Sequence, residues 1–312
     1  MNKLKIVYMG TPLFSVEPLK KLNEIYDVVL VVTQPDKKVG RKQEIVFSPV
    51  KEYAIKNNIE VFQPVKIREE YKEILDKEPD IIITCAYGQI IPKELLIYPK
   101  YKCINIHASL LPKYRGGAPI HHSIINGDEY TGITIMYMDK KMDSGDILYQ
   151  EKIKIEQDDN VGTMFNKLSI LGSNMIIDFL PKLLKNDINP IKQNEEEVTY
   201  AYNITKEDEK LNFSDKSINI FNKIRGLNPF PISYALLDSK RVKIYSSKLG
   251  TSSKSGNIGE IINIYNDGIG VKTLDGEIII TELQFEGKKK TTVKEYLNGI
   301  QNKNSLIGKI FN

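Results

Sequence analysis

Short runs of apolar residues alternate with longer segments that mix apolar and polar positions throughout the first half of the chain. The apolar runs occupy residues 5–9, 28–33, 80–84 and 103–107. Runs without alternating polar positions are typical of strands that are buried on both faces of a sheet. Strand and helix segments in alternation predict a doubly wound α/β domain with a Rossmann-like parallel sheet. Such a sheet binds ligands beyond the carboxyl ends of its strands.

One long helix is expected over residues 159–185. Asn160 can cap its first turn, and apolar residues then recur every three or four positions as far as Leu183. The polar stretch that follows, residues 185–198, contains a proline and is the best candidate for a linker. The expected organisation is a first domain over residues 1–189, a linker over residues 190–208 and a second domain over residues 209–312.

The pattern changes to short alternating runs beyond residue 209. These runs span residues 241–246, 258–264, 268–273 and 277–283. Asn266-Asp267-Gly268 and Asp275-Gly276 lie between them, and both are typical of hairpin turns. The second domain is therefore predicted to be a small antiparallel barrel or sandwich, and an OB-like β-barrel is the preferred interpretation.

The composition is that of a globular protein. Hydrophobic residues make up 41% and charged residues 27% of the 312 positions, which excludes disordered and fibrous classes. The net charge is +4, and all of this excess lies in residues 207–312, which hold 16 Lys/Arg against 12 Asp/Glu. Such an asymmetry favours a module that faces a polyanion.

Cys85 and Cys103 lie in apolar runs, which predicts buried thiols and a reduced, cytoplasmic protein. The amino terminus is expected to be a strand that leads into a Gly-Thr-Pro turn, not a signal peptide. No apolar run approaches the roughly 18–20 residues that span a bilayer. We expect a monomer without membrane association, and no metal site, because no Cys/His cluster has the spacing of metal ligands.

Candidate chemistry is concentrated in residues 104–148. Asn105 and His107 stand two residues apart at the carboxyl end of an apolar run, which places both on one strand face at the ligand-binding edge. Histidine can transfer a proton near neutral pH, and an amide can donate to a developing oxyanion. A histidine that only satisfies core hydrogen bonds is the alternative.

Two turns that follow can bring further polar groups to His107. Residues 113–119 form a glycine-rich loop, and its backbone amides or the Arg115 guanidinium could bind an anionic or polar ligand. The second turn contains Asp143 and Asp146. A carboxylate folded back onto His107 could fix its tautomer and stabilise its charged form. The residues alone do not choose between the two aspartates.

Several other kinds of site are disfavoured. Met9-Gly10-Thr11-Pro12 follows the first strand in place of a Gly-x-Gly-x-x-Gly motif, and Pro12 lacks an amide that a phosphate could bind. Ser109 does not lie in the Gly-x-Ser-x-Gly motif of a nucleophile elbow. An Asn, His and Asp set without a nucleophile suits direct group transfer between two bound substrates.

These residues resemble the signature of the folate-dependent formyltransferase family. The resemblance rests on residues 105–112, Tyr114-Arg115-Gly116 and residues 143–147, and it continues through residues 86–92, 224–231, 283–289 and 297–299. It covers essentially the whole chain. It implies formyl transfer from 10-formyltetrahydrofolate to the amino group of methionine on initiator tRNA, for translation initiation.

The resemblance also implies roles for single residues. Asn105, His107 and Asp143 match the family's catalytic trio, and this analogy favours Asp143 over Asp146. The implied folate-binding residues are Ala86, Tyr87, Gly88, Gln89, Ile90, Ile91, Ser109, Leu110, Leu111, Pro112 and Asp139.

The loop Gln34–Pro49 is the segment that we expect to contact tRNA. A flexible basic loop near the carboxyl end of a strand can reach acceptor-stem phosphates. Its basic residues are Lys37, Lys38, Arg41 and Lys42. The run Lys288-Lys289-Lys290 predicts a second, weaker contact from the carboxyl-terminal domain.

Two other functions are compatible with parts of the sequence. A sugar-nucleotide N-formyltransferase would use the same donor but would not need the basic loop. A non-catalytic RNA-binding relative would not need the Asn, His and Asp set to converge.

Three segments depart from the family's pattern. His121-His122 is expected to begin a helix without a catalytic role. Phe230 replaces the usual Trp, and Tyr200-Ala201-Tyr202-Asn203-Ile204 stands where Pro-Lys is common.

Overall fold

The computed structural model describes residues 3–39 and 43–312, which divide into two compact units. The first unit contains residues 1–119, 131–153 and 165–202, and the second contains residues 120–130, 154–164 and 203–312. The last boundary, between residues 202 and 203, lies inside the segment expected to be a linker. Most of that segment therefore packs with the first unit.

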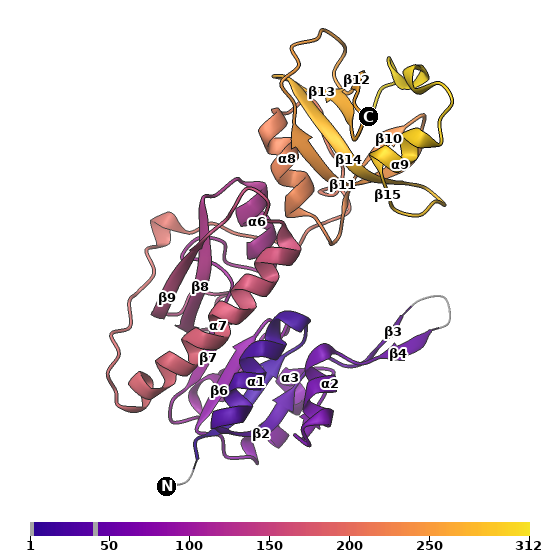
Figure 1. The fold of residues 1–312 in the computed structure, drawn as a ribbon. Helices are drawn as coiled ribbons and strands as arrows, with labels where there is room; N and C mark the ends of the chain where they lie inside the picture. Colours follow the sequence, from indigo (N-terminus) through magenta and orange to yellow (C-terminus); the bar gives the residue numbers. More distant parts are fainter. Residues whose placement is uncertain (1–2, 40–42) are drawn as a thin grey trace. The chain divides into compact units, whose positions relative to one another are not determined.

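The sheet of the first unit confirms the predicted α/β class. Its strands follow the order β5-β2-β1-β6-β7-β8-β9 (Figure 1). They are β1 (Lys5–Gly10), β2 (Asp27–Val32), β5 (Val61–Phe62), β6 (Ile81–Cys85), β7 (Cys103–His107), β8 (Tyr130–Tyr137) and β9 (Ile147–Lys154). The pairs from β5 to β7 are parallel, as the apolar runs predict. β8 is antiparallel to β7, since the chain between them contributes a helix to the second unit instead of a crossover helix on this sheet.

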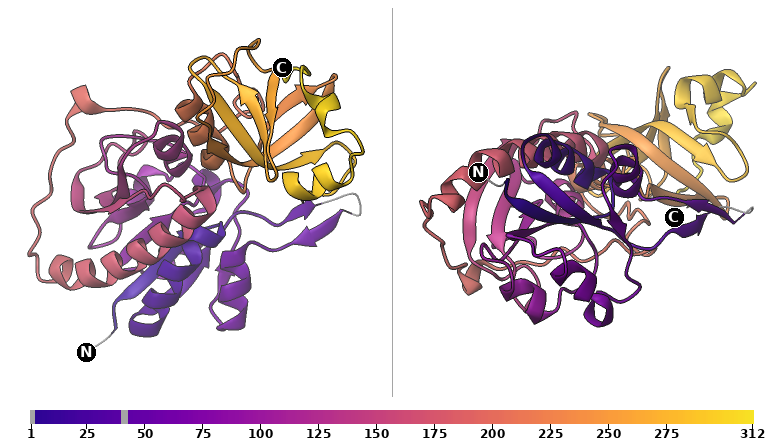
Figure 2. Two further views of the ribbon diagram at one scale, coloured as in Figure 1. Left: turned by 45° about the horizontal axis from the view of Figure 1, so that its top comes forward. Right: turned by 90° about the horizontal axis from the view of Figure 1, so that it is seen from below.

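Helices cover both faces of this sheet (Figures 1 and 2). They are α1 (Val16–Ile25), α2 (Pro49–Lys56), α3 (Ile67–Glu70), α4 (Lys72–Leu75), α5 (Lys93–Ile97) and α7 (Val161–Leu184), with short 3-10 turns η1 (Leu13–Ser15) and η2 (Glu195–Glu197). On one face, Val7 and Ile82 share a buried cluster with Ile74 and Leu95 of α4 and α5. On the other face, Gly172 of α7 lies against Ile106 of β7. Within the described part of the chain, no helix has both the length and the apolar character needed to cross a membrane.

The long helix α7 agrees with its prediction to within two residues. The Asn160 side chain accepts a hydrogen bond from the Thr163 amide at 3.0 Å and caps the first turn. Further along, the Ser169 hydroxyl donates to the Phe14 carbonyl at 2.8 Å, and the Phe165 and Phe14 rings meet edge to face. The apolar stripe of this helix therefore packs against the sheet layer, as its spacing indicates.

The segment Gln34–Pro49 contains an antiparallel hairpin, whereas the sequence predicted a flexible loop. Its strands β3 (Lys37–Val39) and β4 (Glu44–Val46) project from the first unit (Figure 1). The base of the hairpin is fixed by Asp36, which pairs with Lys51 Nζ at 2.5 Å and accepts from Gln63 Nε2 at 2.9 Å. The hydrogen bond from Lys51 is the main cause of the lowered pKa of Asp36.

The second unit is the predicted antiparallel barrel. Its strands follow the order β10-β11-β14-β13-β12, with β15 paired to β14. The elements are α6 (Pro119–Ile125), α8 (Ser217–Gly226), β10 (Ser233–Leu237), β11 (Lys240–Leu249), β12 (Ile261–Ile264), β13 (Ile269–Lys272), β14 (Glu277–Phe285), β15 (Thr291–Thr292), α9 (Val293–Asn298) and η3 (Lys303–Leu306). The carboxyl-terminal residues pair with both edges of the sheet, through Leu237 to Phe311 and Glu260 to Ile310. These bridges close the sheet and remove its free edges.

Cys85 and Cys103 are free and buried on the neighbouring strands β6 and β7. Burial raises the pKa of Cys85 from 9.0 to about 12 and also raises the pKa of Cys103. A thiol that is buried and protonated is a poor nucleophile.

We predict that neither thiol reacts with a disulfide reagent such as DTNB in the native protein at pH 8, and that both react after denaturation. The folded pKa of Cys85 exceeds its unfolded value, so its contribution to stability is complete below about pH 9 and declines toward pH 12. Between pH 8 and 10, the free energy of unfolding should therefore fall by about 1 kcal/mol more in the wild type than in Cys85→Ala. Urea titrations at the two pH values measure this, and rapid native labelling or equal pH dependence would contradict it.

Candidate active site

Asn105 lies at the carboxyl end of β7 beside the end of β6. Its Oδ1 accepts a hydrogen bond of 2.8 Å from the Thr84 hydroxyl, the residue paired with it in the sheet. This contact orients the amide, because an oxygen that already accepts a bond leaves Nδ2 as the group that donates to a ligand. The sheet register therefore presents an amide donor at the ligand-binding edge.

His107 follows two residues later on the same strand face and is only 6% exposed. Its Nε2 lies 3.0 Å from the carbonyl oxygen of Tyr114. A carbonyl only accepts, so Nε2 carries the proton, and Nδ1 is the basic nitrogen of the neutral ring. The tautomer is thus set by a backbone carbonyl, whereas the sequence had offered a carboxylate for this task.

Asp143 is the aspartate that the structure brings to His107. Its Oδ2 lies 3.7 Å from His107 Nδ1 and accepts a hydrogen bond of 2.8 Å from the Gly116 amide. Asp146 instead contributes its backbone carbonyl to the Tyr137 amide at 3.0 Å. A carboxylate at this distance stabilises a protonated imidazole by Coulomb attraction without forming a direct hydrogen bond.

Two glycines allow the loops on either side of His107 to approach other backbone segments. A Cβ at Gly116, where φ is +126°, would lie 2.6 Å from the Ala201 carbonyl oxygen. A Cβ at Gly145 would lie 1.9 Å from the Tyr137 carbonyl oxygen. Both approaches are shorter than any side chain permits, so the loop geometry depends on these two residues.

The Arg115 guanidinium does not face a ligand, so that expectation is wrong. Arg115 is 2% exposed, and its Nη2 donates to Gln193 Oε1 and to Glu195 Oε1 at 2.8 Å each. The hydrogen bond from Arg115 lowers the pKa of Glu195. Arg115 therefore fastens the segment after α7 to the glycine-rich loop, because a buried guanidinium is stable only with such partners.

Gln193 is a site residue that sequence reasoning missed. Its Nε2 donates to the carbonyl oxygens of Asp143 and Gly145 at 2.8 Å each, while its Oε1 receives the bonds from Arg115. It thereby holds the loop that carries the Asp143 carboxylate. Gln193 lies in a polar stretch that was expected to be a linker, and nothing in the local pattern marks it, because its partners are about 50 and 80 residues away.

The residues expected to bind folate differ in their accessibility. Ala86, Gly88, Ile90 and Asp139 are exposed, and the Ile90 side chain is 64% exposed. Gln89, Leu110 and Pro112 are half-buried. Tyr87, Ile91, Ser109 and Leu111 are buried, and the Ser109 hydroxyl donates to the Lys113 carbonyl at 2.6 Å. A ligand can therefore meet the side chains of the first group, while the buried group shapes the loops beneath them.

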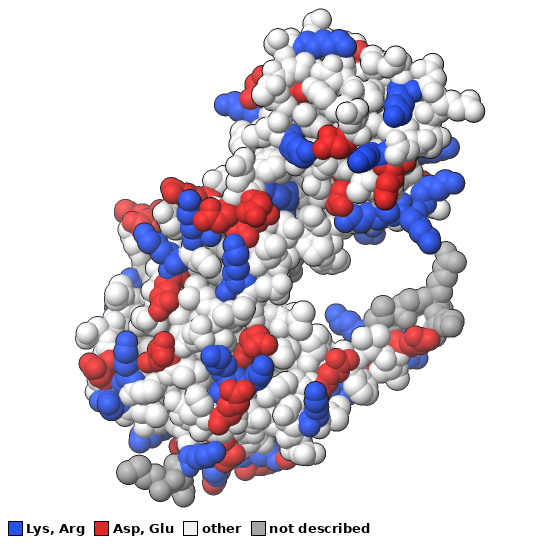
Figure 3. Space-filling view, viewed as in Figure 1, with Lys and Arg blue, Asp and Glu red and all other residues white. Residues whose placement is uncertain are grey.

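The expected tRNA contacts lie on the hairpin and on the barrel. Lys37 and Lys38 are exposed on β3, while Arg41 and Lys42 lie outside the described residues. Lys288, Lys289 and Lys290 are exposed after β14. Lys290 Nζ pairs with Glu282 at 3.0 Å and lies over the Tyr245 ring. Basic side chains gather along one edge of the barrel in the face drawn in Figure 3.

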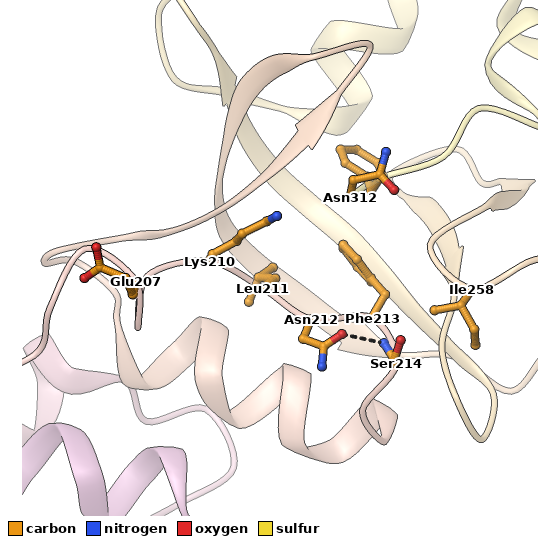
Figure 4. Close-up of a pocket in the computed structure, with 9 residues that line it drawn as sticks. Glu207, Lys210, Leu211, Asn212, Phe213, Ser214, Ile258 and Asn312 are labelled. Atoms are coloured by element: carbon orange, nitrogen blue, oxygen red, sulfur yellow. Dashed lines mark hydrogen bonds between the residues drawn. The ribbon is translucent and has the colours of Figure 1, made fainter.

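A separate hollow of about 500 Å³ lies in the second unit (Figure 4). It is lined by Glu207, Lys210, Leu211, Asn212, Phe213, Ser214, Ile258, Phe311 and Asn312. Within it, the Asn212 side chain accepts a hydrogen bond from the Ser214 amide at 3.0 Å, which closes a turn. None of the residues proposed from the sequence lines this hollow.

Comparison with known families finds two matches along the chain. Residues 4–180 match the family described as "Formyl transferase", and residues 203–301 match "Formyl transferase, C-terminal domain".

Curated relatives match over nearly the full length. A protein of Bacillus thuringiensis subsp. konkukian named methionyl-tRNA formyltransferase is 49% identical over 300 residues, which cover 95% of this chain and 96% of that protein. A protein of Mesoplasma florum with the same name is 48% identical and covers 95% of each chain.

Solved structures share the fold at lower identity. The N-formyltransferase of Helicobacter canadensis, solved with folinic acid and dTDP-3-aminofucose, matches with a TM-score of 0.66 and 23% identity over 90% of this chain and 99% of that chain. HypX of Aquifex aeolicus, solved with tetrahydrofolic acid, matches with a TM-score of 0.64 and 16% identity over 96% of this chain and 48% of that chain.

We predict that Gln193→Ala loosens the loop of Asp143 without unfolding the protein. The variant loses two hydrogen bonds to the loop, each worth about 1 kcal/mol. Local amide exchange should therefore become roughly tenfold faster or more. Hydrogen exchange at the amides of Gly116 and Tyr137, which bond to Asp143 and Asp146, measures this. Asn194→Ala is the matched control, because that neighbouring side chain accepts from the Glu196 amide within its own turn and does not bond to the loop of Asp143 among the described residues. Unchanged exchange in Gln193→Ala would show that the bonds do not hold the loop.

Proposed function

The chain belongs to the formyl transferase family, and we propose that it transfers a formyl group from 10-formyltetrahydrofolate to the amino group of methionine on initiator tRNA. The observation that carries this proposal is the full-length match, at 48–49% identity, to relatives named methionyl-tRNA formyltransferase. The N-formyltransferase of Helicobacter canadensis, solved with dTDP-3-aminofucose, is similar at only 23% identity, and that similarity supports the fold alone. The protein acts in translation initiation, in the cytoplasm and as a monomer.

The segment after β6 is suited to the formyl donor. Ile90 presents an exposed apolar side chain, against which a flat heteroaromatic ring can pack. Ala86 and Gly88, both at positive φ, are exposed and leave backbone groups uncovered. Together with the half-buried Gln89, Leu110 and Pro112, these residues form our proposed folate contacts. The buried members of the set support the loops from below.

Asn105 stabilises the charge that develops during transfer. When the amine adds to the formyl carbon, a new N–C bond forms and the formyl oxygen gains negative charge. The Asn105 amide can donate to that oxygen through Nδ2, since its Oδ1 is held by Thr84. A donor that is oriented before the reaction has no reorganisation cost at the moment of charge development.

His107 transfers the proton of the attacking amine, and Asp143 stabilises the charged form of His107. Nδ1 of His107 accepts that proton, because Nε2 is committed to the Tyr114 carbonyl. The imidazolium that results lies 3.7 Å from Asp143 Oδ2, which stabilises its positive charge. His107 then returns the proton to the folate nitrogen as the bond between that nitrogen and the formyl carbon breaks. A non-catalytic RNA-binding relative would not require this convergence.

Lys37 and Lys38 on the hairpin are the proposed contacts to the acceptor-stem phosphates, together with Arg41 and Lys42. Lys288, Lys289 and Lys290 supply a second contact from the barrel. Phosphate contacts position a nucleic acid without reading its sequence. Their contribution to binding falls with added salt.

The decisive experiment measures formyl transfer from 10-formyltetrahydrofolate to methionyl initiator tRNA and, in parallel, to an amino-sugar nucleotide. We expect transfer to the tRNA only. His107→Ala should lower kcat by about 10²–10⁴-fold, because the proton transfer loses its base. His122→Ala, a half-buried histidine on α6, is the control and should stay near the wild-type rate. Transfer to the sugar without transfer to the tRNA would overturn the proposal, and a near-normal rate for a folded His107→Ala would overturn the assigned trio.

Charge reversal on the hairpin should weaken tRNA binding selectively. The double variant Lys37→Glu/Lys38→Glu is expected to raise the KM for the tRNA and to leave the KM for the folate unchanged. The slope of the logarithm of the tRNA affinity against the logarithm of the salt concentration should become shallower by about one for each lost phosphate contact. Lys20→Glu/Lys56→Glu, on exposed positions of α1 and α2, changes the net charge equally. Equal effects in the two doubles would show that only net charge matters.

A further inference from the structure

Tyr200 and Tyr202 form a stacked and exposed aromatic pair on the segment that follows α7. Their ring centroids are 5.7 Å apart and the ring planes differ by 7°. The residues are 48% and 66% exposed, whereas Ala201 between them is fully buried. Tyr200 forms an isolated β-bridge with Arg115, and the alternation is that of an extended segment, here called a strand, which places residues two apart on one face.

Backbone hydrogen bonds hold this strand in place. The Ala201 amide donates to the Arg115 carbonyl at 2.8 Å, the Arg115 amide donates to the Thr199 carbonyl at 2.9 Å, and the Ala118 amide donates to the Ala201 carbonyl at 3.0 Å. The Tyr114 amide donates to the Thr199 hydroxyl at 2.9 Å. The two rings therefore stand on a fixed base and not on a flexible linker.

The strand is attached to the same loop that holds His107 and Asp143. The Tyr114 carbonyl accepts from His107, and the Gly116 amide donates to Asp143. An acceptor group delivered to His107 must therefore pass close to this loop. For an aminoacyl-tRNA, the methionyl ester is attached to the 3′ end, so the unpaired nucleotides next to it pass there as well.

The chemistry of the pair suits a base and not a phosphate. Aromatic faces stack on nucleobases without regard to sequence. The nearby acidic run Glu195–Glu197 is exposed and disfavours a phosphate contact along this segment.

We propose that Tyr200 and Tyr202 form a stacking platform for an unpaired nucleobase at the 3′ end of the tRNA substrate. This inference rests on the proposed function. Tyr202 offers the more exposed ring, and Tyr200, which forms a β-bridge with Arg115 of the glycine-rich loop, stacks against it. The platform orients the 3′ end, while the basic residues bind the phosphates.

Binding of deacylated initiator tRNA, intact or trimmed of its unpaired 3′ nucleotides, tests the platform. Tyr202→Leu should weaken binding of the intact tRNA about tenfold, because a stacking partner is lost. Tyr202→Phe keeps the ring and should restore binding. The trimmed tRNA should bind the wild type and both variants equally. Tyr98→Leu, at another exposed tyrosine, is the control and should change neither affinity.

Two binding results would overturn the platform: an unchanged affinity of Tyr202→Leu for intact tRNA, or an equal loss with intact and trimmed tRNA. The second would indicate a structural role, and thermal unfolding of the variant would reveal it. Formyl transfer by the wild type separates this proposal from the function on which it rests. Transfer that survives Tyr202→Leu with an unchanged KM refutes only the platform, whereas absence of transfer by the wild type refutes the proposed function and the platform together.

Discussion

The backbone pairing between the glycine-rich loop and the strand around Ala201 is the contact on which the candidate active site depends. Through this loop, the Tyr114 carbonyl sets the tautomer of His107 and the Gly116 amide holds Asp143. The buried Arg115 reinforces the pairing through Gln193 and Glu195. Arg115 is buried, so loss of these hydrogen-bond partners would be unfavourable. A displaced strand would therefore disturb the histidine and the aspartate together.

The segment between α7 and the barrel therefore belongs to the first unit as far as Tyr202. It supplies Gln193 to the loop of Asp143, and its backbone around Ala201, between the two tyrosines, pairs with the glycine-rich loop. A polar composition is typical of linkers, but it is also what a strand needs when its partners are loop carbonyls and a guanidinium. In the proposed mechanism, β7 therefore carries the Asn105 amide and the His107 imidazole. The segment after α7 positions the loops that contact them.

The parts of the fold that depend on local periodicity could be predicted. Continuous apolar runs identified the strands β1, β2, β6 and β7, and the stripe from Phe165 onward identified α7. The predictions differed from the structure where contacts with residues distant in the sequence determine the conformation. The hairpin of β3 and β4 depends on the base formed by Asp36, Lys51 and Gln63. Arg115 looked like a ligand residue because its two partners lie about 80 positions away.

The sequence by itself determined the two-part organisation, the strand end that carries Asn105 and His107, and the family resemblance, because burial periodicity and short motifs are written in neighbouring residues. Only the tertiary structure decided that Asp143, not Asp146, approaches His107 and that Nδ1 is the basic nitrogen. It also revealed Gln193 and the paired tyrosine rings. The approach of Asp143 to His107 and the hydrogen bonds of Gln193 join segments far apart in the chain, and such contacts cannot be inferred from spacing along it.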